Sequence, residues 1–447
     1  MDWLANIPLI GSPLITILAF IVLMGIVVTI HEYGHYIVGR WVGIHAEVFS
    51  LGFGPTLWSR VDKRGTKWQV AAVPLGGYVK FLGDRDAAST AASEAMNDMN
   101  DYDRRRSFPA AAVWRRFLTV LAGPVFNFIL SAAIFTSLVF WQGVAVERPT
   151  VGEVTPLPFE NPLQSGDVIL AINDSPVPDY EAFSRALNAL RQAETYENIL
   201  IQVQRDGEEI YLTTPYFMPP LVSSVVPLTP AYKAGLKPGD VILSVNGEDI
   251  GSFEALRSKV EAALDKKITL LVWREGTELE LSLSPALVDH PLGDGTFEER
   301  VQIGVGGDIY FAFMTETPSF LKAAEIGTRQ VYTVMKSSLN GLKHIILGNI
   351  SVKNLQGPIG IAQISSAAVQ TGTFDFIFLI GVISTAIGLL NLFPIPVLDG
   401  GHLVTYVYEA IMRKPPNPRF LQGVMAVGMV LLLSMMLLAT YNDIMRL

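Results

Sequence analysis

The sequence predicts an α-helical polytopic membrane protein with four transmembrane helices, a membrane-associated β-hairpin and two tandem α+β domains. Three observations support this fold class. Half of the 447 residues are hydrophobic and only 17% are charged, four long segments carry no charged residue, and the polar middle of the chain contains an internal repeat. The net charge of −9 offers no basic surface, so no nucleic-acid partner is expected.

Each of the four uncharged segments is long enough to cross a bilayer, which takes about 20 apolar residues. They are Trp3–Ile30, Phe117–Val146, Phe376–Leu398 and Phe420–Asn442. The first segment has no basic start and no small-residue cleavage site, so it does not read as a cleavable signal peptide. We therefore expect four spans.

The distribution of Lys and Arg predicts the orientation of these spans. Basic residues collect between residues 40 and 116 and again between residues 413 and 419. Loops rich in Lys and Arg stay on the cytoplasmic side. The sequence thus predicts a bacterial inner-membrane protein with both termini and the long middle segment in the periplasm.

The middle segment repeats one short pattern. Ser165–Leu170 (SGDVIL) recurs as Pro238–Leu243 (PGDVIL), and a helical stretch and alternating strands follow each copy. A Gly-Asp turn before a β-branched strand indicates a small β-rich module with one helix. Beyond the repeats, Ser319–Gly348 has an amphipathic pattern. This helix is expected either on the outer membrane surface or packed on the repeats as a linker.

The candidate chemistry begins with His31-Glu32-Tyr33-Gly34-His35, an H-E-x-x-H pattern. Residues four apart share one face of a helix, so His31 and His35 can bind one Zn²⁺ while Glu32 serves as general base toward water. The chain has no cysteine, so a third ligand must be His, Asp or Glu. Ionisable groups at membrane depth are costly and usually functional.

Asp399 is the best candidate for the third ligand. It follows the third uncharged segment, which the predicted orientation brings to the same cytoplasmic depth as His31. Pro394 and Pro396 interrupt a regular helix there, and such backbone is tolerated in a membrane only where protein or water satisfies it. His402 is a competing ligand.

A β-hairpin is expected over Trp68–Leu82, where Val70, Ala72 and Val79 alternate with other positions around a Pro/Gly-rich turn. A free strand edge can hold a peptide by β-addition. A plain surface hairpin is the alternative.

The chain at this point resembles a known family. H-E-x-x-H in a first span, with Leu398-Asp399-Gly400 in a late one, is similar to the site-2 protease family of intramembrane zinc metalloproteases. The two repeats resemble the PDZ domains of its proteobacterial regulator-of-sigma-E branch. The similarity extends over Gly52–Pro55, Pro74–Lys80 and Ala122–Asn127, and covers essentially the whole chain.

The resemblance implies roles for individual residues. It makes His31, His35 and Asp399 the zinc ligands and Glu32 the catalytic residue. The residues that it places in or near the substrate site are Asn391, Pro394, Pro396, Gly76, Gly77, Tyr78 and Asn127. It also implies single-pass membrane substrates, such as an anti-sigma factor in an envelope stress response and remnant signal peptides, with the PDZ domains gating their entry.

These predictions divide the chain into five parts. Residues 1–146 hold two spans and the hairpin, 147–218 the first PDZ-like domain, 219–315 the second, 316–350 the amphipathic helix and 351–447 the last two spans. Ala231–Leu236 matches a peptide-binding turn in the second copy. The first copy has Pro156–Pro162 there, so it is expected to act as a steric gate if it binds no peptide.

Two other classes of function are open at this point. A membrane-anchored PDZ scaffold would bind chain ends without cutting them, and it need hold no stoichiometric zinc. A metal-ion transporter would use the same ligands for transit, but it would need a polar path through several spans.

Overall fold

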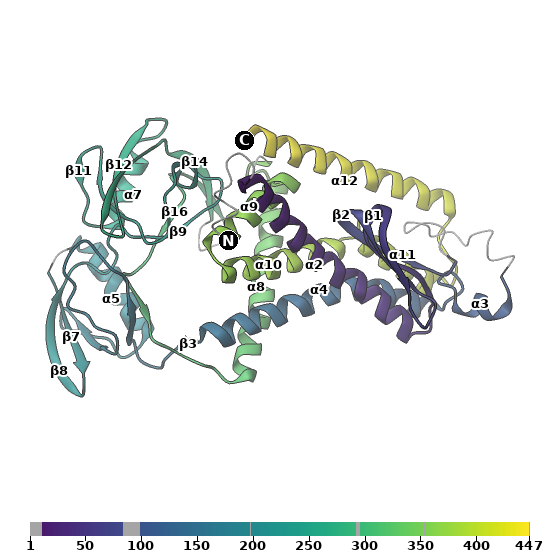
Figure 1. Cartoon of the computed structure of the whole chain (residues 1–447), viewed down its shortest axis with the longest axis horizontal. Helices are drawn as coiled ribbons and strands as arrows, with labels where there is room; N and C mark the ends of the chain where they lie inside the picture. Colours follow the sequence, from purple (N-terminus) through teal and green to yellow (C-terminus); the bar gives the residue numbers. More distant parts are fainter. Residues whose placement is uncertain (1–10, 84–98, 197, 292–295, 353–354, 447) are drawn as a thin grey trace. The chain divides into compact units, whose positions relative to one another are not determined.

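The computed structural model describes residues 11–83, 99–196, 198–291, 296–352 and 355–446 (Figure 1). The chain divides into two compact units. One unit combines Met1–Leu138 with Phe320–Leu447, and the other is Val139–Ser319.

Among the described residues, 4 helices are long and apolar enough to span a membrane: α2 (Gly11–Trp41), α4 (Val113–Gln142), α10 (Thr373–Asn391) and α12 (Pro418–Arg446). Two of these helices differ in extent from the uncharged segments of the sequence. Helix α2 does not stop at Ile30 but runs through the H-E-x-x-H pattern to Trp41. Helix α10 ends at Asn391, before the end of the uncharged segment at Leu398, as predicted from the two prolines that follow, which cannot continue a helix. The start of the first predicted span lies outside the described residues.

Small residues bring the helices of this unit close together. A Cβ atom on Gly34 of α2 would lie 2.5 Å from the Ala122 carbonyl oxygen of α4. One on Gly381 of α10 would lie 2.7 Å from the Phe135 ring. The α2 and α4 backbones can therefore approach closely where these residues are glycine.

Three helices were not predicted separately: α3 (Asp101–Arg106), α9 (Pro358–Thr371) and α11 (Asp399–Met412). The buried Asp443 of α12 accepts hydrogen bonds from the backbone N–H groups of Gly357 and Gly360, at 3.1 and 2.9 Å. It thereby satisfies two donors at the start of α9, as an N-cap does.

The amphipathic helix is α8 (Phe320–Ile346). Its buried Val331 packs with Phe135 and Leu138 of α4, and a Cβ atom on Gly327 would lie 2.5 Å from the Thr136 hydroxyl. The apolar face thus packs on membrane-unit helices.

The predicted hairpin is part of a larger sheet, so its extent was wrong. Strand β1 (Ala46–Val61) pairs with β2 (Lys67–Phe81), and both strands fold back on themselves. Leu51 pairs with Val70 on one side and with Gly77 on the other. Residues 58–61, 67–70, 48–51 and 77–80 therefore lie in this order across the sheet. The left-handed backbone at Gly52 and Gly54, with φ of +89° and +86°, favours glycine where β1 reverses.

The other unit holds two similar modules. In the first, strands β6 (Ser175–Pro176), β5 (Val168–Ile172), β7 (Ile199–Arg205) and β8 (Glu208–Thr214) form one sheet with α5 (Tyr180–Gln192). In the second, β11 (Glu248–Asp249), β10 (Val241–Val245), β12 (Ile268–Arg274) and β13 (Thr277–Leu283) repeat this order, with α7 (Phe253–Glu261). We call them repeat 1 and repeat 2. A short helix, α6 (Pro230–Ala234), and a hairpin of β14 (Ala286–Pro291) and β15 (Phe297–Gln302) also belong to repeat 2.

The chain returns to repeat 1 after it has completed repeat 2. Strand β16 (Val305–Gly307) pairs with β9 (Val222–Val225) of repeat 2. The next strand, β17 (Phe311–Phe313), pairs with β4 (Val151–Val154) of repeat 1, and β18 (Thr315–Glu316) pairs with β3 (Val144–Ala145). Residues 311–313, which the predicted division assigned to the second domain (219–315), therefore pair with repeat 1 instead.

Candidate metal centre and substrate sites

Helix α2 presents His31 and His35 on one face, one turn apart. Their Nε2 atoms lie 3.2 Å from each other, and the two rings meet edge to face with centroids 4.8 Å apart. His35 points its Nδ1 at the backbone carbonyl of Thr119 in α4, at 2.9 Å. This contact leaves Nε2 of His35 free to bind a metal.

Asp399 reaches the same point from α11. Its Oδ2 lies 3.2 Å from Nε2 of His31 and 3.5 Å from Nε2 of His35. Glycines make this approach possible, because a Cβ on Gly400 would lie 2.2 Å from the Phe393 carbonyl oxygen and one on Gly401 2.4 Å from that of Ile395. The first turn of α11 therefore packs directly on the interrupted segment before it.

The three donor atoms fit zinc. Tetrahedral ligands at about 2.0–2.1 Å from Zn²⁺ lie about 3.3–3.4 Å apart, close to the 3.2, 3.2 and 3.5 Å observed. Within the described parts of the chain, the buried Oδ2 of Asp399 has no hydrogen-bond partner. Such an orphaned carboxylate atom beside two imidazoles is what a bound cation would satisfy.

The charge state of Asp399 agrees with this role. Burial by itself would raise the pKa of its carboxyl, but the neighbouring His35 and His31 rings lower it, and the net pKa lies below its ordinary value. The side chain is therefore held as the anion that metal binding requires.

Helix α4 packs against both rings through a glycine. A Cβ on Gly123 would lie 2.4 Å from Nε2 of His35 and 2.8 Å from Cε1 of His31. Any side chain at this position would displace the imidazoles, so Gly123 is required by the close approach of α4. One turn later, the Asn127 amide lies 3.3 Å from Nδ1 of His31.

Glu32 faces a cavity of about 180 Å³ beside the three donor atoms. Its carboxyl is hydrogen-bonded by the backbone of Val79 in β2, and its Cγ lies 3.2 Å from where a Cβ of Gly77 would stand. The strand segment 77–80 thus lies directly against the predicted general base. The cavity is lined by His31, Glu32, His35, Gly77, Tyr78, Val79, Phe81, Phe108, Thr119, Val120, Asp399, His402 and Tyr406.

Sequence reasoning missed part of this lining. His402 was considered only as a competing ligand, and Tyr406, Thr119 and Phe108 were not singled out. His402 and Tyr406 lie one turn apart on α11, so their four-residue spacing was the available signal. That signal has meaning only once a helix is known to begin at Asp399.

The other predicted substrate residues separate into groups. Gly77 and Tyr78 line the cavity, whereas Gly76 lies against the Phe53 ring. Pro394 and Pro396 line a second, largely apolar cavity of about 440 Å³ beside α11 and α12, which His402 also borders. Among the described residues, neither cavity is lined by Asn391, the last residue of α10, or by Asn127.

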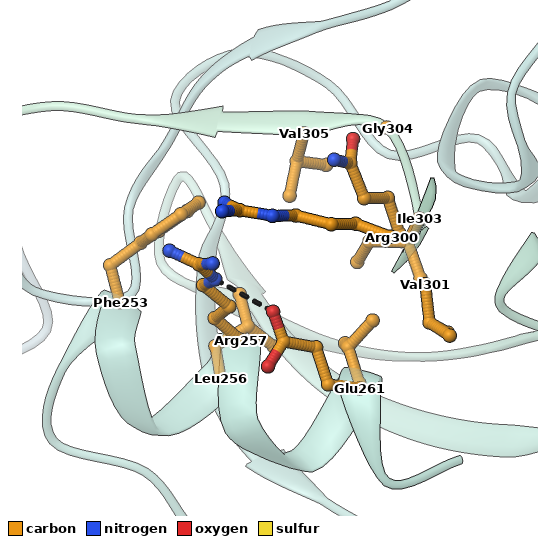
Figure 2. A pocket seen from close by; sticks show the side chains of 11 residues that line it. Phe253, Leu256, Arg257, Glu261, Arg300, Val301, Ile303, Gly304 and Val305 are labelled. Carbon is orange, nitrogen blue, oxygen red and sulfur yellow. Dashed lines mark hydrogen bonds and ion pairs between the residues drawn. The ribbon is translucent and has the colours of Figure 1, made fainter. Parts of the chain in front are cut away.

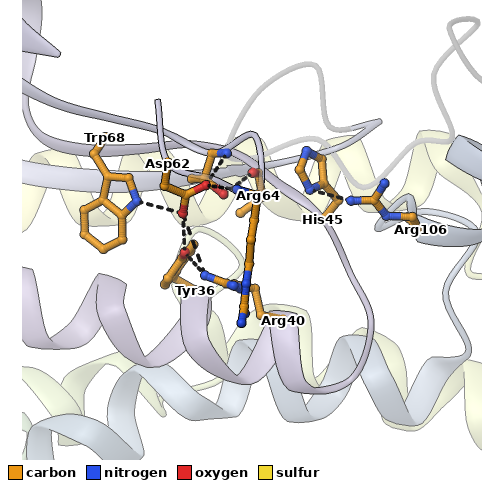
Figure 3. Close-up of polar contacts among 9 residues, drawn as sticks. Tyr36, Arg40, His45, Asp62, Arg64, Trp68 and Arg106 are labelled. Atoms are coloured by element: carbon orange, nitrogen blue, oxygen red, sulfur yellow. Dashed lines mark hydrogen bonds and ion pairs between the residues drawn. The ribbon is translucent and has the colours of Figure 1, made fainter. Parts of the chain in front are cut away.

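A polar cluster fastens the β-sheet to the last turns of α2 (Figure 3). Asp62, which follows β1, accepts hydrogen bonds from Tyr36 and from the Trp68 indole, both at 3.3 Å. Arg40 also bonds to Tyr36 and lies 3.8 Å from Asp62. These contacts begin one residue after His35, so they help to fix β1 and β2 relative to the predicted metal ligands.

Repeat 2 carries a separate groove of about 190 Å³ between α7 and residues 300–305 (Figure 2). Its apolar lining includes Leu256, Val260 and Ile303. Figure 2 shows Arg300 reaching across the groove toward Phe253. The predicted peptide-binding turn, Ala231–Leu236, is not among the residues that line this groove; it covers most of α6 and the residues that end it.

In repeat 1 an aromatic side chain of the equivalent strand packs on the helix. Phe313 of β17 lies edge to face against Tyr180 and Phe183 of α5, with ring centroids 4.8 and 5.2 Å apart. The two repeats therefore differ where the groove would form.

Comparison with known proteins gives a consistent result. The model of peptidase family M50 matches residues 19–435. A Rhizobium meliloti protein provisionally named as a zinc metalloprotease is 33% identical over 431 residues, covering 96% of each chain. The Regulator of sigma E protease of Salmonella typhi is 32% identical over 459 residues, covering 96% of this chain and 98% of its own.

Proposed function

The chain belongs to peptidase family M50 and is a zinc metalloprotease with membrane helices; from this premise we propose which residues cut and what they cut. His31, His35 and Asp399 bind the zinc ion, and Glu32 is the general base. The observation that supports this proposal is the convergence of three donor atoms, all within 4.8 Å of one another, from two separate helices.

Zinc held by these residues supplies a Lewis acid that polarises a peptide carbonyl and lowers the pKa of water. The protein's own groups carry out the proton transfers. Glu32 takes a proton from the attacking water and returns it to the leaving amine, a role worth about 10²–10⁴-fold in rate. Glu32 and Val79 of β2 line the same cavity, so the carboxyl lies beside the strand where the substrate would pair.

The substrate is a single-span membrane protein whose helix unwinds beside the sheet. Residues 77–80 pair through one edge with residues 48–51, and the other edge receives the unwound segment by β-addition. Gly77 and Tyr78 line the cavity, so a strand paired there passes close to Glu32. Pro394 and Pro396, which line the neighbouring cavity, contact the continuation of the same segment.

The two repeats control which substrates reach the site. Repeat 2 offers an open groove for an apolar chain end. Repeat 1 excludes substrates with a large outer domain by steric hindrance. A substrate passes after its outer part has been shortened. An anti-sigma factor is the first proposed natural substrate, supported by the name of the Salmonella relative. Remnant signal peptides are a second, proposed from the family resemblance of the sequence alone. The protein lies in a bacterial inner membrane with both repeats in the periplasm.

The test is cleavage of a panel of single-span substrates by the purified full-length protein, read by mass spectrometry. Cleavage within the membrane segment is expected, with loss of cleavage on zinc chelation and at least a 100-fold loss in Glu32→Gln. Tyr33→Phe, which lies beside Glu32 but outside the cavity lining, is the matched control. Normal cleavage by Glu32→Gln would refute its assignment as the general base.

The two alternative classes conflict with the family assignment. A scaffold or transporter would not cut, although each could bind metal or chain ends. Only product formation that depends on Glu32 separates these classes from the proposed protease.

A further inference from the structure

Asn127 is a fully buried polar residue in the middle of α4. Its side-chain nitrogen lies 3.3 Å from Nδ1 of His31. Its Oδ1 has no hydrogen-bond partner within the described parts of the chain. A buried amide with an unused acceptor beside a predicted metal ligand requires a physical explanation.

The metal-binding geometry of His31 decides which of its nitrogens carries a proton. Nε2 faces both Nε2 of His35 and Oδ2 of Asp399, so Nε2 is the atom that can bind zinc. In a neutral imidazole, the other nitrogen then carries the hydrogen and donates it. Nδ1 of His31 therefore needs an acceptor, which an amide NH₂ group cannot be.

A half-turn of the Asn127 amide supplies this acceptor, because the oxygen and nitrogen ends occupy equivalent positions. We propose that Asn127 is a positioning residue: in the zinc-loaded protein its Oδ1 accepts the Nδ1–H of His31 and holds Nε2 toward the metal. This inference rests on the proposed zinc ligation. It replaces the substrate-binding role that the sequence predicted for Asn127.

The second ligand supports the same arrangement. His35 has its Nδ1 at 2.9 Å from the Thr119 carbonyl oxygen, which is already an acceptor. Helix α4 therefore faces the Nδ1 atoms of both ligands, with a backbone group for His35 and a side chain for His31. Hydrogen-bond acceptors of this kind orient metal-binding histidines and raise their basicity.

The packing around Asn127 holds it in place. Its backbone carbonyl accepts hydrogen bonds from Ser131, at 2.9 Å, and from Ser384 of α10, at 3.0 Å. A Cβ on Gly388 would lie 3.1 Å from the Asn127 Cβ. Since Asn127 does not line the active-site cavity, this environment favours contact with the ligand over contact with substrate.

The test is the zinc affinity of the full-length protein in detergent, measured by competition with a chromophoric chelator. Asn127→Leu keeps the size but removes the acceptor, and we expect affinity to fall about 10–100-fold. Asn127→Asp restores an acceptor and should bind within a few-fold of the parent. Ser137→Ala, at an exposed position of the same helix away from His31, should leave the affinity unchanged.

Several outcomes would overturn the inference. Parental zinc affinity in Asn127→Leu with a raised KM would indicate a substrate contact instead. Equal losses of zinc affinity in Asn127→Asp and Asn127→Leu would indicate a packing role. If Asn127→Leu does not fold, a tenfold loss of zinc affinity in Asn127→Asp decides against the inference. Cobalt substitution supplies a second readout, because the Co²⁺ absorption bands should change in Asn127→Leu and stay near the parent's in Asn127→Asp.

A further control separates this inference from its premise. Should His31→Ala leave zinc affinity unchanged, the proposed ligation itself fails. Should His31→Ala lose zinc while Asn127→Leu retains it, only the role of Asn127 fails.

Discussion

Repeat 1 and repeat 2 share one scaffold, yet their described residues differ beside the helix: a groove lies against α7 in repeat 2, whereas Phe313 packs on α5 in repeat 1. In both, a buried aspartate of the Gly-Asp turn pairs with an arginine at the end of the third strand. The Arg205–Asp167 and Arg274–Asp240 pairs have N···O distances of 2.7 and 2.6 Å. The shared sequence pattern therefore preserves the fold, while residues outside it decide whether a ligand can enter.

One strand position differs between the two repeats. Phe313 of β17 pairs with Val151, and Gly307 of β16 pairs with Val222 at the corresponding place. In repeat 2, Phe253 lies over Gly307, where a Cβ would meet its ring at 2.4 Å. In repeat 1, the Phe313 ring occupies that side of the strand and packs on α5. The same side of the strand is thus covered by a strand residue, Phe313, in repeat 1 and by a helix residue, Phe253, in repeat 2.

The largest effect should come from breaking the shared scaffold. Arg205→Met and Arg274→Met each leave a buried aspartate unpaired, which costs about 3–5 kcal/mol. Hydrogen–deuterium exchange in the full-length protein should show each repeat loosening separately and by a similar amount. If one variant loosened its repeat and the other did not, the two scaffolds would not be equivalent.

The next effect should come from opening repeat 1. Phe313→Ala removes part of an aromatic cluster, and about 2–3 kcal/mol of local stability should be lost, below the 3–5 kcal/mol of a fully buried Phe, because Phe313 is half-buried. Repeat 1 should also gain measurable binding of peptides with an apolar carboxyl end. No gain in binding would mean that other residues also close the groove.

Closing the groove of repeat 2 should have a smaller effect, on the free energy of peptide binding. Val305 lines the groove and corresponds in strand pairing to Phe311 of repeat 1, so Val305→Phe should weaken peptide binding about tenfold, or about 1.4 kcal/mol. Val226→Phe, at an exposed position outside the groove, is the matched control. Fluorescence titration with a labelled peptide would measure both, and equal affinities would contradict the location of the groove.

The smallest effect should come from the rim. Arg300 lines the groove and also pairs with Glu298, so Arg300→Gln should weaken binding of an acidic peptide only about two- to fivefold, as rim charges usually do. The loss should shrink at high salt. A loss that is independent of salt would point to packing by the Arg300 side chain rather than to its charge.

Several features of the fold and site could be predicted because they are local. Charge-free segments indicated four spans, and the spacing of His31 and His35 placed both rings on one helix face. The interruption of the helix after α10 was also predicted, because a proline interrupts the helix in which it lies. Ligand roles for these residues, with Asp399, stay predictions.

Other features depend on segments that are distant in the sequence. The double pairing of residues 48–51, the closure of repeat 1 by β17 and the helix that starts at Asp399 all lay beyond local patterns. So did the difference between a filled and an open groove. Each of these features depends on contacts between segments that are far apart in the sequence.

The sequence alone determined the membrane segments, the repeat and the residue types available for chemistry, since helical period, hydropathy and ligand preference are properties of neighbouring residues. The tertiary structure decided how Asp399 approaches the two imidazoles and why Gly123 and Asn127 face them. These arrangements depend on how closely α2, α4 and α11 pack, and packing distances are set by contacts between segments rather than by any one of them.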